Sequence, residues 1–328
     1  MTKLTDPLGR EITYLRLSVT DRCNFRCRYC LPERASFMPR KDMLSMAELA
    51  RIGEAFITLG IKKIRLTGGE PLMRKGITEL AERLGAHLSK GLDELTLTTN
   101  ASHLAPHANT LKQAGLKRIN ISLDTLNPTL FHKITGGADI KPVLQGIDAA
   151  QKAGLKVKIN TLALKGINEQ EIPALIEWAH HRNMEMTLIE TMPLGDTGLD
   201  LSEHYLPLSE VTKPLSLTPI NKNTGGPARY MRFEKTGGTI GLITPISENF
   251  CASCNRVRVS ASGNLFSCLG DARSTPLRLL LRTHAEDNAP LTAAIYKAIA
   301  HKPKRHDFSI SAHSTTPQLK RYMAHTGG

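Results

Sequence analysis

Long apolar segments are missing from this sequence of 328 residues. No window reaches the run of about 18 apolar residues that a membrane-spanning helix needs. The first residues, MTKLTDPLGR, contain neither the apolar stretch nor the small-residue cleavage site of a secretory signal. We therefore expect a cytoplasmic protein with no membrane partner.

Cysteine is also scarce: the chain has six, which is too few for a disulfide scaffold. Hydrophobic residues make up 41% of the chain and charged residues 22%. This globular balance excludes disorder over most of the sequence, and the length allows about two domains.

Acidic residues are outnumbered, since 43 Lys and Arg against 30 Asp and Glu leave a net charge of +13. Such a charge attracts an anion, which could be a nucleotide, a nucleic acid or an acidic lipid. The densest basic run, residues 301–306, is short and interrupted by Pro303, which is typical of a solvated surface. No RRM, KH or zinc-finger signature is present, so we expect no nucleic-acid partner.

Strand and helix patterns alternate up to Pro193. Short apolar runs predict strands at residues 14–19, 63–66, 94–98, 118–123, 157–162 and 186–190. Helical crossovers make such strands parallel, and six units predict an α/β fold, a partial (β/α)6 TIM-like barrel over residues 1–193. Chemistry would then sit at the carboxyl ends of the strands. Later Gly and Pro pairs predict a smaller, irregular C-terminal domain over residues 194–328.

Two of the crossovers carry clear helix-start signals. Ser45 and Glu48 have the spacing of a capping box at the start of a helix over residues 45–59. Asn127 followed by Pro128 is typical of an N-cap residue with proline in the first helical position.

The first cysteine triplet is Cys23, Cys27 and Cys30, with C-x3-C-x2-C spacing directly after the first predicted strand. Three thiolates suit a soft metal, and on a [4Fe-4S] cube they would leave one iron open for an exogenous ligand. Structural zinc or free thiols remain the alternatives, although no fourth His or Cys follows before His87.

This triplet, with Tyr29 before its last cysteine, resembles the radical S-adenosylmethionine (SAM) superfamily. A second motif agrees: Gly68, Gly69 and Glu70 stand in Thr-Gly-Gly-Glu-Pro at the end of the second predicted strand. The resemblance implies that the open iron chelates SAM, and that the backbone and Glu70 of this motif receive the SAM amino group.

The second triplet is Cys251, Cys254 and Cys268, with Arg256 and Arg258 directly behind the first two cysteines. Its C-x2-C-x13-C spacing again provides three thiolates without a nearby fourth ligand. Structural zinc with a distant histidine stays open at this point.

Together with the C-terminal Gly327 and Gly328, these motifs resemble the GTP 3′,8-cyclase family of molybdenum cofactor biosynthesis over essentially the whole chain. The resemblance implies a lyase that converts GTP to (8S)-3′,8-cyclo-7,8-dihydroguanosine 5′-triphosphate with SAM and two [4Fe-4S] clusters. It implies that the second cluster contacts the guanine, and that Gly327 and Gly328 reach the active site in a catalytic role.

The resemblance also assigns ligand contacts residue by residue. Contacts to GTP are implied for Arg16, Arg65, Thr98, Lys158, Arg256 and Arg258. Contacts to SAM are implied for Tyr29, Gly68, Gly69, Glu70, Ser122 and Met192.

The chain departs from the family pattern in two places. Thr187 stands where the family usually has Arg, which puts one polar contact in doubt. Ala101 replaces the usual Gly after Thr99-Asn100, so that turn cannot use a positive φ as freely.

The implied partners are GTP and a reducing electron donor, with a monomer or homodimer as the assembly. The product would pass to cyclic pyranopterin monophosphate synthase. Two other functions remain as alternatives: a radical SAM maturase of a peptide or protein with an auxiliary cluster, and a basic nucleic-acid-binding protein with structural zinc.

Overall fold

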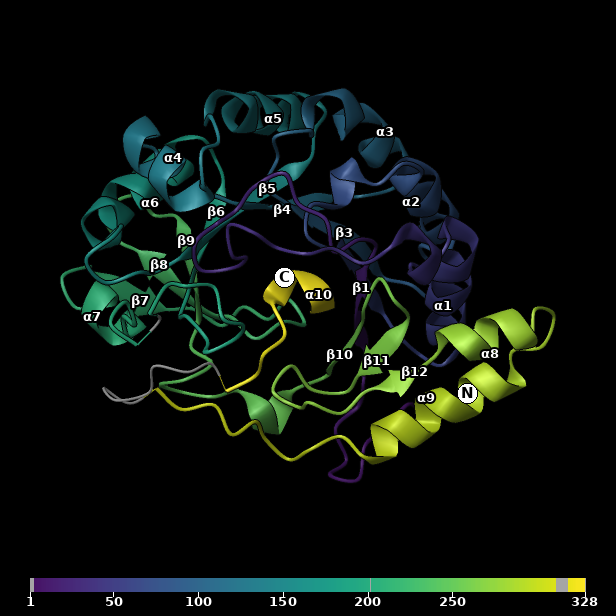
Figure 1. Cartoon of the computed structure of the whole chain (residues 1–328). Coiled ribbons are helices and arrows are strands. Elements are labelled where there is room, and N and C mark those ends of the chain that lie inside the picture. The colour runs from purple at the N-terminus through teal and green to yellow at the C-terminus, as the bar shows by residue number, and fades with distance from the viewer. Residues whose placement is uncertain (1–2, 201, 311–317, 328) are drawn as a thin grey trace.

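One twelve-stranded sheet, wrapped by helices, forms the molecule in the computed structural model, which describes residues 3–200, 202–310 and 318–327 (Figure 1). The strands are β1 Tyr14–Ser18, β2 Lys63–Thr67, β3 Glu94–Thr99, β4 Arg118–Ser122, β5 Lys156–Leu162, β6 Glu185–Ile189, β7 Leu217–Pro219, β8 Arg229–Phe233, β9 Thr239–Ile243, β10 Arg256–Val259, β11 Asn264–Phe266 and β12 Thr275–Pro276. The helices are α1 Met46–Thr58, α2 Ile77–Gly85, α3 Ala108–Gln113, α4 Pro128–Thr135, α5 Lys141–Lys152, α6 Ile172–His181, α7 Leu208–Thr212, α8 Arg278–Thr283, α9 Ala289–Ala300 and α10 Met323–Thr326.

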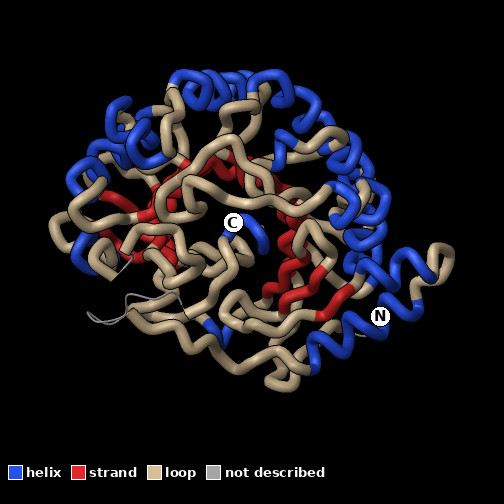
Figure 2. Tube along the Cα trace, viewed as in Figure 1, coloured by secondary structure: helices blue, strands red, loops and turns tan. Residues whose placement is uncertain are grey.

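Strands β1 to β6 pair in chain order, and every pair is parallel. All six predicted strands are present, with ends that differ by one residue at most from the prediction. Helices cover the outside of the curved sheet, and the strands line its inner wall (Figure 2). The partial TIM-like barrel is therefore confirmed.

The C-terminal part of the chain extends this sheet at both edges, which the sequence patterns did not predict. Strand β10 pairs in parallel with β1, and β9 pairs in parallel with β6, so eight consecutive strands run in one direction. The remaining C-terminal strands add antiparallel to these edges. The predicted division into domains at residue 193 stays a prediction.

Both helix-start signals are confirmed. The Ser45 hydroxyl accepts from the Glu48 amide at 3.1 Å, and the Glu48 carboxylate accepts from the Ser45 amide at 2.6 Å. The Asn127 side chain accepts from two amides of the first turn of α4. These bonds satisfy amides that have no partner within the helix, so each crossover starts at a defined residue.

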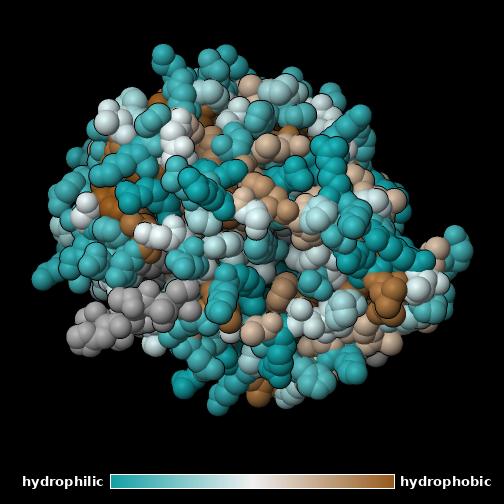
Figure 3. Space-filling view, in the orientation of Figure 1, coloured by the Kyte–Doolittle hydropathy of each residue, from teal (hydrophilic) through white to brown (hydrophobic). Residues whose placement is uncertain are grey.

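The main core lies between the sheet and its helices, where the apolar faces of α1, α2, α5 and α6 are buried. The face seen in Figure 3 is mostly hydrophilic, with small and separate hydrophobic patches. No helix of the described residues is long and apolar enough to cross a membrane. The inner wall of the barrel is left for polar side chains.

Candidate active site

A single cavity of about 370 Å³ inside the barrel is lined by all six cysteines. The first triplet enters from the loop after β1, and the second from the segments around β10 and β11. Residues more than 200 positions apart in the sequence therefore face one space. The two triplets, predicted separately, belong to one site.

The first triplet is held in place by the Gly68-Gly69 turn that follows β2. The Gly69 amide donates to the Thr20 carbonyl, and the Glu70 amide to the Arg22 carbonyl, both at 2.8 Å. A Cβ atom on Gly69 would lie 2.4 Å from the Arg22 oxygen, so a side chain there would push the cysteine loop away. The glycines allow this close approach.

Glu70 is fully buried and does not line the cavity. Its carboxylate accepts from the Leu72 amide, the Asn100 amide and the Thr99 hydroxyl. Burial raises its pKa to about 7, against these hydrogen bonds. In this structure Glu70 joins the end of β2 to the end of β3, and its implied contact with SAM stays a prediction.

Tyr29 is oriented by an aspartate that the sequence analysis did not identify. Its hydroxyl donates to the Asp124 carboxylate at 2.5 Å, and the Leu162 amide donates to the other Asp124 oxygen at 2.9 Å. Burial raises the pKa of Asp124 to about 6. Asp124 thus holds Tyr29 toward the cavity next to the first triplet.

The electrostatic surroundings of the two triplets differ. Burial raises the pKa of Cys23 to about 11 and that of Cys30 to about 12. Burial also acts on Cys254, but the positive charges of Arg256 and Lys302 overcome it and lower the Cys254 pKa to about 7. A thiolate is therefore stabilised at Cys254 even without a metal, whereas burial raises the pKa of Cys268 in the same triplet.

The donor set fits iron-sulfur cubes, because each triplet offers three cysteine thiols to the cavity and such cubes take thiolate ligands. No three His, Cys, Asp or Glu side chains in the described ranges converge closely enough to hold a single metal ion. A zinc ion draws its sulfur ligands to about 2.3 Å. In a [4Fe-4S] cube each thiolate binds a different iron, so the sulfur atoms stand farther apart. Cys23, Cys27 and Cys30 would hold one such cluster, and the second triplet the other.

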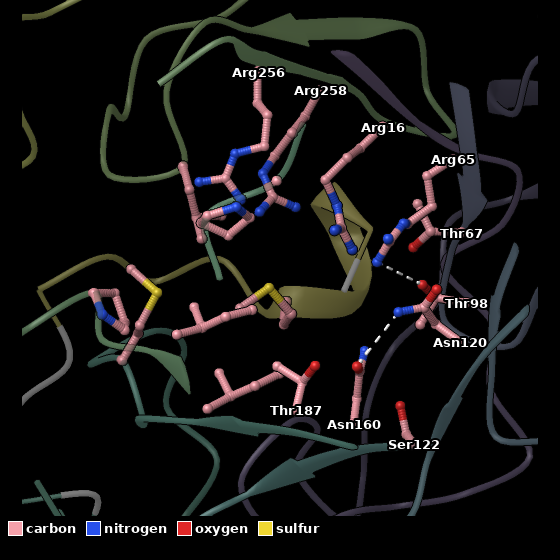
Figure 4. A pocket seen from close by; sticks show the side chains of 18 of the residues that line it. Arg16, Arg65, Thr67, Thr98, Asn120, Ser122, Asn160, Thr187, Arg256 and Arg258 are labelled. Atoms are coloured by element: carbon pink, nitrogen blue, oxygen red, sulfur yellow. Dashed lines mark hydrogen bonds between the residues drawn. The ribbon is translucent and has the colours of Figure 1, made fainter. Parts of the chain in front are cut away.

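Three arginines stand in one row across neighbouring parallel strands. Arg258 on β10 is level with Arg16 on β1, and Arg16 is level with Arg65 on β2. Arg256, two residues before Arg258, lines the same side of the cavity (Figure 4). Side chains two residues apart on a strand share a face, so strand pairing alone assembles this cationic wall.

The positive charges of this cationic wall repel one another, which is unfavourable in free energy when no anion is bound. Burial, together with Arg65 and Arg256, lowers the pKa of Arg16 to about 10. Burial, with Arg16 and Arg256, lowers the pKa of Arg258 well below its usual range. Tyr14 lies among these charges, which outweigh its burial and lower its pKa to about 8. A polyanion would relieve this repulsion.

Lys158 on β5 belongs to the same site. It is buried and donates to the Tyr230 hydroxyl at 2.8 Å. Burial, followed by the charge of Arg118, lowers its pKa to about 7. An anion near Lys158 would favour its charged form.

Uncharged polar side chains line the wall opposite the arginines, as Figure 4 shows for Ser122, Asn160 and Thr187. Asn120 donates to Asn160 at 3.4 Å. Within the described residues, the Asn120 side-chain oxygen and the Thr187 hydroxyl are buried without a hydrogen-bond partner. Thr187 therefore presents a polar atom to the cavity.

The C-terminal tail enters the barrel, and α10 lies at its centre in Figure 1. The Gly327 carbonyl accepts from Arg258 at 2.6 Å. Gly327 has φ +80, and a Cβ there would lie 2.9 Å from the side chain of Thr67. Gly328 lies outside the described residues. A catalytic role for either glycine stays a prediction.

The turn after β3 does adopt a positive φ despite its alanine. Ala101 has φ +63, and its amide donates to the Thr99 hydroxyl at 2.9 Å. The turn therefore adopts the positive φ that its alanine was expected to use less freely. The alanine pays for it in conformational strain energy.

Most of the predicted site residues line the cavity. Those that do are Arg16, Cys23, Cys27, Tyr29, Cys30, Arg65, Gly68, Gly69, Thr98, Ser122, Lys158, Met192, Cys251, Cys254, Arg256, Arg258 and Cys268. Glu70 and Gly327 are not among them. This geometry does not test the contacts with SAM and GTP that the sequence analysis predicts for these residues.

Other lining residues escaped the sequence analysis, among them Tyr14, Lys63, Asn120, Asn160 and Tyr230. The first four stand two residues from a predicted contact on the same strand, which puts them on the same face. The alternation of side chains along each strand could therefore have identified these four residues from the sequence. Tyr230 lies on β8, whose pairing no local pattern indicated.

Two family models match the chain in succession. The Radical SAM superfamily model matches residues 17–179. The Molybdenum Cofactor Synthesis C model matches residues 184–308.

Similar solved structures support the fold alone. Streptococcus suis SuiB bound to precursor peptide SuiA superposes with a TM-score of 0.50 at 17% identity, covering 63% of this chain and 46% of SuiB. HydG, a maturase of the [FeFe]-hydrogenase, also has a TM-score of 0.50 and 17% identity, covering 62% of this chain and 48% of HydG.

Curated relatives are far more similar. The GTP 3′,8-cyclase of Rhizobium etli (strain CIAT 652) is 54% identical over 329 residues, which cover 99% of this chain and 94% of the relative. The GTP 3′,8-cyclase of Brucella ovis is 53% identical over 330 residues, with coverage of 99% and 96%. On these near-full-length matches, the chain belongs to the GTP 3′,8-cyclase family of the radical SAM superfamily.

Proposed function

We propose that this protein converts GTP to (8S)-3′,8-cyclo-7,8-dihydroguanosine 5′-triphosphate, the first step of molybdenum cofactor biosynthesis. The observation that carries the proposal is a cavity lined both by two cysteine triplets and by five arginines. Relatives named GTP 3′,8-cyclase match the chain over almost its full length. When bound, the first cluster and SAM supply the radical that removes a hydrogen atom from the ribose.

The arginine row suits the triphosphate. Arg16, Arg65 and Arg258 are level with one another on adjacent strands, so their guanidinium groups can contact successive phosphates. Guanidinium forks donate paired, charge-assisted hydrogen bonds to phosphate oxygens. The Thr98 hydroxyl, on the neighbouring strand β3, accepts from Arg65 at 3.4 Å. These contacts would orient the nucleotide between the two triplets.

We assign SAM to one end of the cavity and the guanine of GTP to the other. Tyr29, held by Asp124, lies at the first triplet, where SAM would bind. The second triplet lies beside Arg256 and Arg258, and its open iron would contact the guanine. The uncharged wall with Ser122 and Asn160 would face the sugars. Holding the ribose close to the source of the radical is the main contribution of the protein.

We place this enzyme in the cytoplasm, since its six cysteines are unpaired, as is typical of a reducing compartment. A low-potential electron donor would supply the electron for SAM cleavage, and a cyclic pyranopterin monophosphate synthase would take the product. A monomer or a homodimer is compatible with a site built within one chain.

The test is an anaerobic assay of the iron-loaded protein with GTP, SAM and dithionite, read by mass spectrometry. We expect 5′-deoxyadenosine and a cyclised GTP in equal amounts, and neither from Cys27→Ser. Cys268→Ser should retain the first cluster but form no cyclised product. SAM cleavage that leaves GTP unchanged would contradict the proposal and favour a peptide maturase.

A further inference from the structure

Lys302 is a buried lysine beside the second cysteine triplet, two residues after the end of α9. Its exposed fraction is 5%, so the prediction that residues 301–306 form a solvated surface is wrong for this residue. In Figure 1 the chain leaves α9 and runs across the lower part of the view. Burial of a lysine is unusual unless its charge is balanced.

The Lys302 ammonium donates to three groups around the triplet. These are the sulfur of Cys254 at 3.6 Å, the carbonyl of Arg256 at 2.9 Å and the carbonyl of Ser267. Arg256 follows Cys254 by two residues, and Ser267 directly precedes Cys268. One side chain therefore uses all three of its donors to join the two segments that carry Cys254 and Cys268.

Arg10 links the same segment to Cys251, the remaining cysteine of the triplet. It donates to the carbonyls of Cys251 at 2.7 Å, Pro303 at 2.7 Å and Lys304 at 3.0 Å. Its charge is balanced by the buried carboxylate of Asp6. Lys302 and Arg10 thus link the segment after α9 to the chain segments that carry the three cysteines.

The two cations differ in what balances them. Within the described residues, no carboxylate lies within ion-pair distance of Lys302, whereas Arg10 has Asp6. A buried ammonium without an anion is strongly unfavourable. The Cys254 sulfur lies 3.6 Å from the Lys302 ammonium, and in the loaded protein the thiolates bound to iron would supply the balancing negative charge.

We propose that Lys302 is a positioning residue of the second cluster, which holds its ligand segments together and adds a positive charge at its sulfur ligands. The inference rests on the proposed function, because it requires a cluster at the second triplet. Net charge and hydrogen bonds to the sulfurs set the reduction potential of such clusters. Loss of the charge should make the potential of the second cluster more negative and leave that of the first unchanged.

The experiment compares Lys302→Met, which keeps the length of the side chain but not its charge, with Lys302→Arg, which keeps the charge. Lys297→Met is the matched control, because Lys297 is exposed on the neighbouring helix α9. Each full-length variant is loaded anaerobically, its iron is counted, and both clusters are titrated by electron paramagnetic resonance. The signal that survives in Cys27→Ser identifies the second cluster.

We expect a more negative potential for the second cluster in Lys302→Met, with values near those of the unmodified protein in Lys302→Arg and Lys297→Met. If Lys302→Met instead loses the second cluster, about four irons should remain of about eight, and Lys302→Arg should restore the others. An unchanged potential in Lys302→Met would overturn the proposal, as would equal defects in the Met and Arg variants or loss of both clusters.

The unmodified protein separates this proposal from the proposed function. If it binds only about four irons when fully loaded, the second triplet holds no cluster, and the proposed function fails. If it binds about eight, the variants test Lys302 alone.

Discussion

Arg258 donates to the carbonyl oxygen of Gly327 at 2.6 Å, so the C-terminal tail meets the arginine row inside the barrel. The contact joins strand β10 to a residue 69 positions later in the chain. It uses the backbone of Gly327, in a conformation, φ +80, that favours glycine. The tail therefore orients a residue that we assign to the triphosphate.

Truncation after Thr326 should abolish cyclisation but leave both clusters and the fold intact, because the tail adds little to the core. GTP affinity should stay within a few-fold, since Arg16 and Arg65 keep their places on β1 and β2. Iron content, melting temperature, GTP affinity and product yield measure these effects. Normal cyclisation in the truncated protein would mean that the tail has no catalytic role.

Binding of GTP should be accompanied by proton uptake at Lys158. With a pKa of about 7, the Lys158 side chain is mostly the neutral amine at about pH 8, and a nearby phosphate would raise that pKa. Titration calorimetry in buffers of different ionisation enthalpy measures the uptake. It should fall in Lys158→Met, and equal uptake in both proteins would contradict the assignment.

The same depressed pKa makes the stability of the ligand-free protein depend on pH. Between about pH 7 and pH 10 the unfolded chain holds the Lys158 proton that the folded chain has released. The unfolded state then binds more protons, so the contribution of Lys158 to the free energy of unfolding rises with pH. In Lys158→Met this part of the rise should be absent from urea titrations across that range.

Arg65→Met should weaken GTP binding about ten- to hundredfold, because a charge-assisted phosphate contact is worth about 1.5–3 kcal/mol. SAM affinity should change little. The ligand-free variant should melt no lower than the unmodified protein, since one of several neighbouring cations is gone. Arg34→Met, on an exposed loop, is the control and should change neither affinity. Equal weakening of GTP and SAM by Arg65→Met would point to a folding defect.

In the cluster-free protein, Cys254 should be alkylated more readily than Cys23 and Cys30. At about pH 7.5 its pKa of about 7 leaves it mostly thiolate, while Cys23 and Cys30, near 11 and 12, stay protonated. Brief iodoacetamide treatment and peptide mass spectrometry identify the labelled site, and circular dichroism checks the fold. Preferential labelling of Cys23 or Cys30 would contradict the proposed electrostatics.

Ala101→Gly should raise the free energy of unfolding by up to about 1 kcal/mol, because alanine is strained at φ +63 and glycine is not. Part of that gain is offset by the greater freedom of glycine in the unfolded chain. Urea unfolding measures the change. Lower stability in the variant would show that packing of the buried Ala101 methyl group outweighs the strain.

Local pattern was enough to place β1 to β6 and the starts of α1 and α4. Ser45 with Glu48, and Asn127 with Pro128, act over a few residues, so their effect is readable without the fold. Strands β9 and β10 were not placed, because their parallel pairing with β6 and β1 depends on contacts between distant segments. No periodicity in a short strand indicates its neighbour.

The sequence by itself determined the chemistry of the site: two cysteine triplets, a glycine turn and several arginines, each recognisable by residue type and spacing. Only the tertiary structure decided how they combine. Arg258 joins Arg16 and Arg65 because β10 pairs with β1, and Lys302 is buried because its segment packs on the second triplet. The physical reason is that charge interactions depend on distance in space, and strand pairing sets that distance independently of separation along the chain.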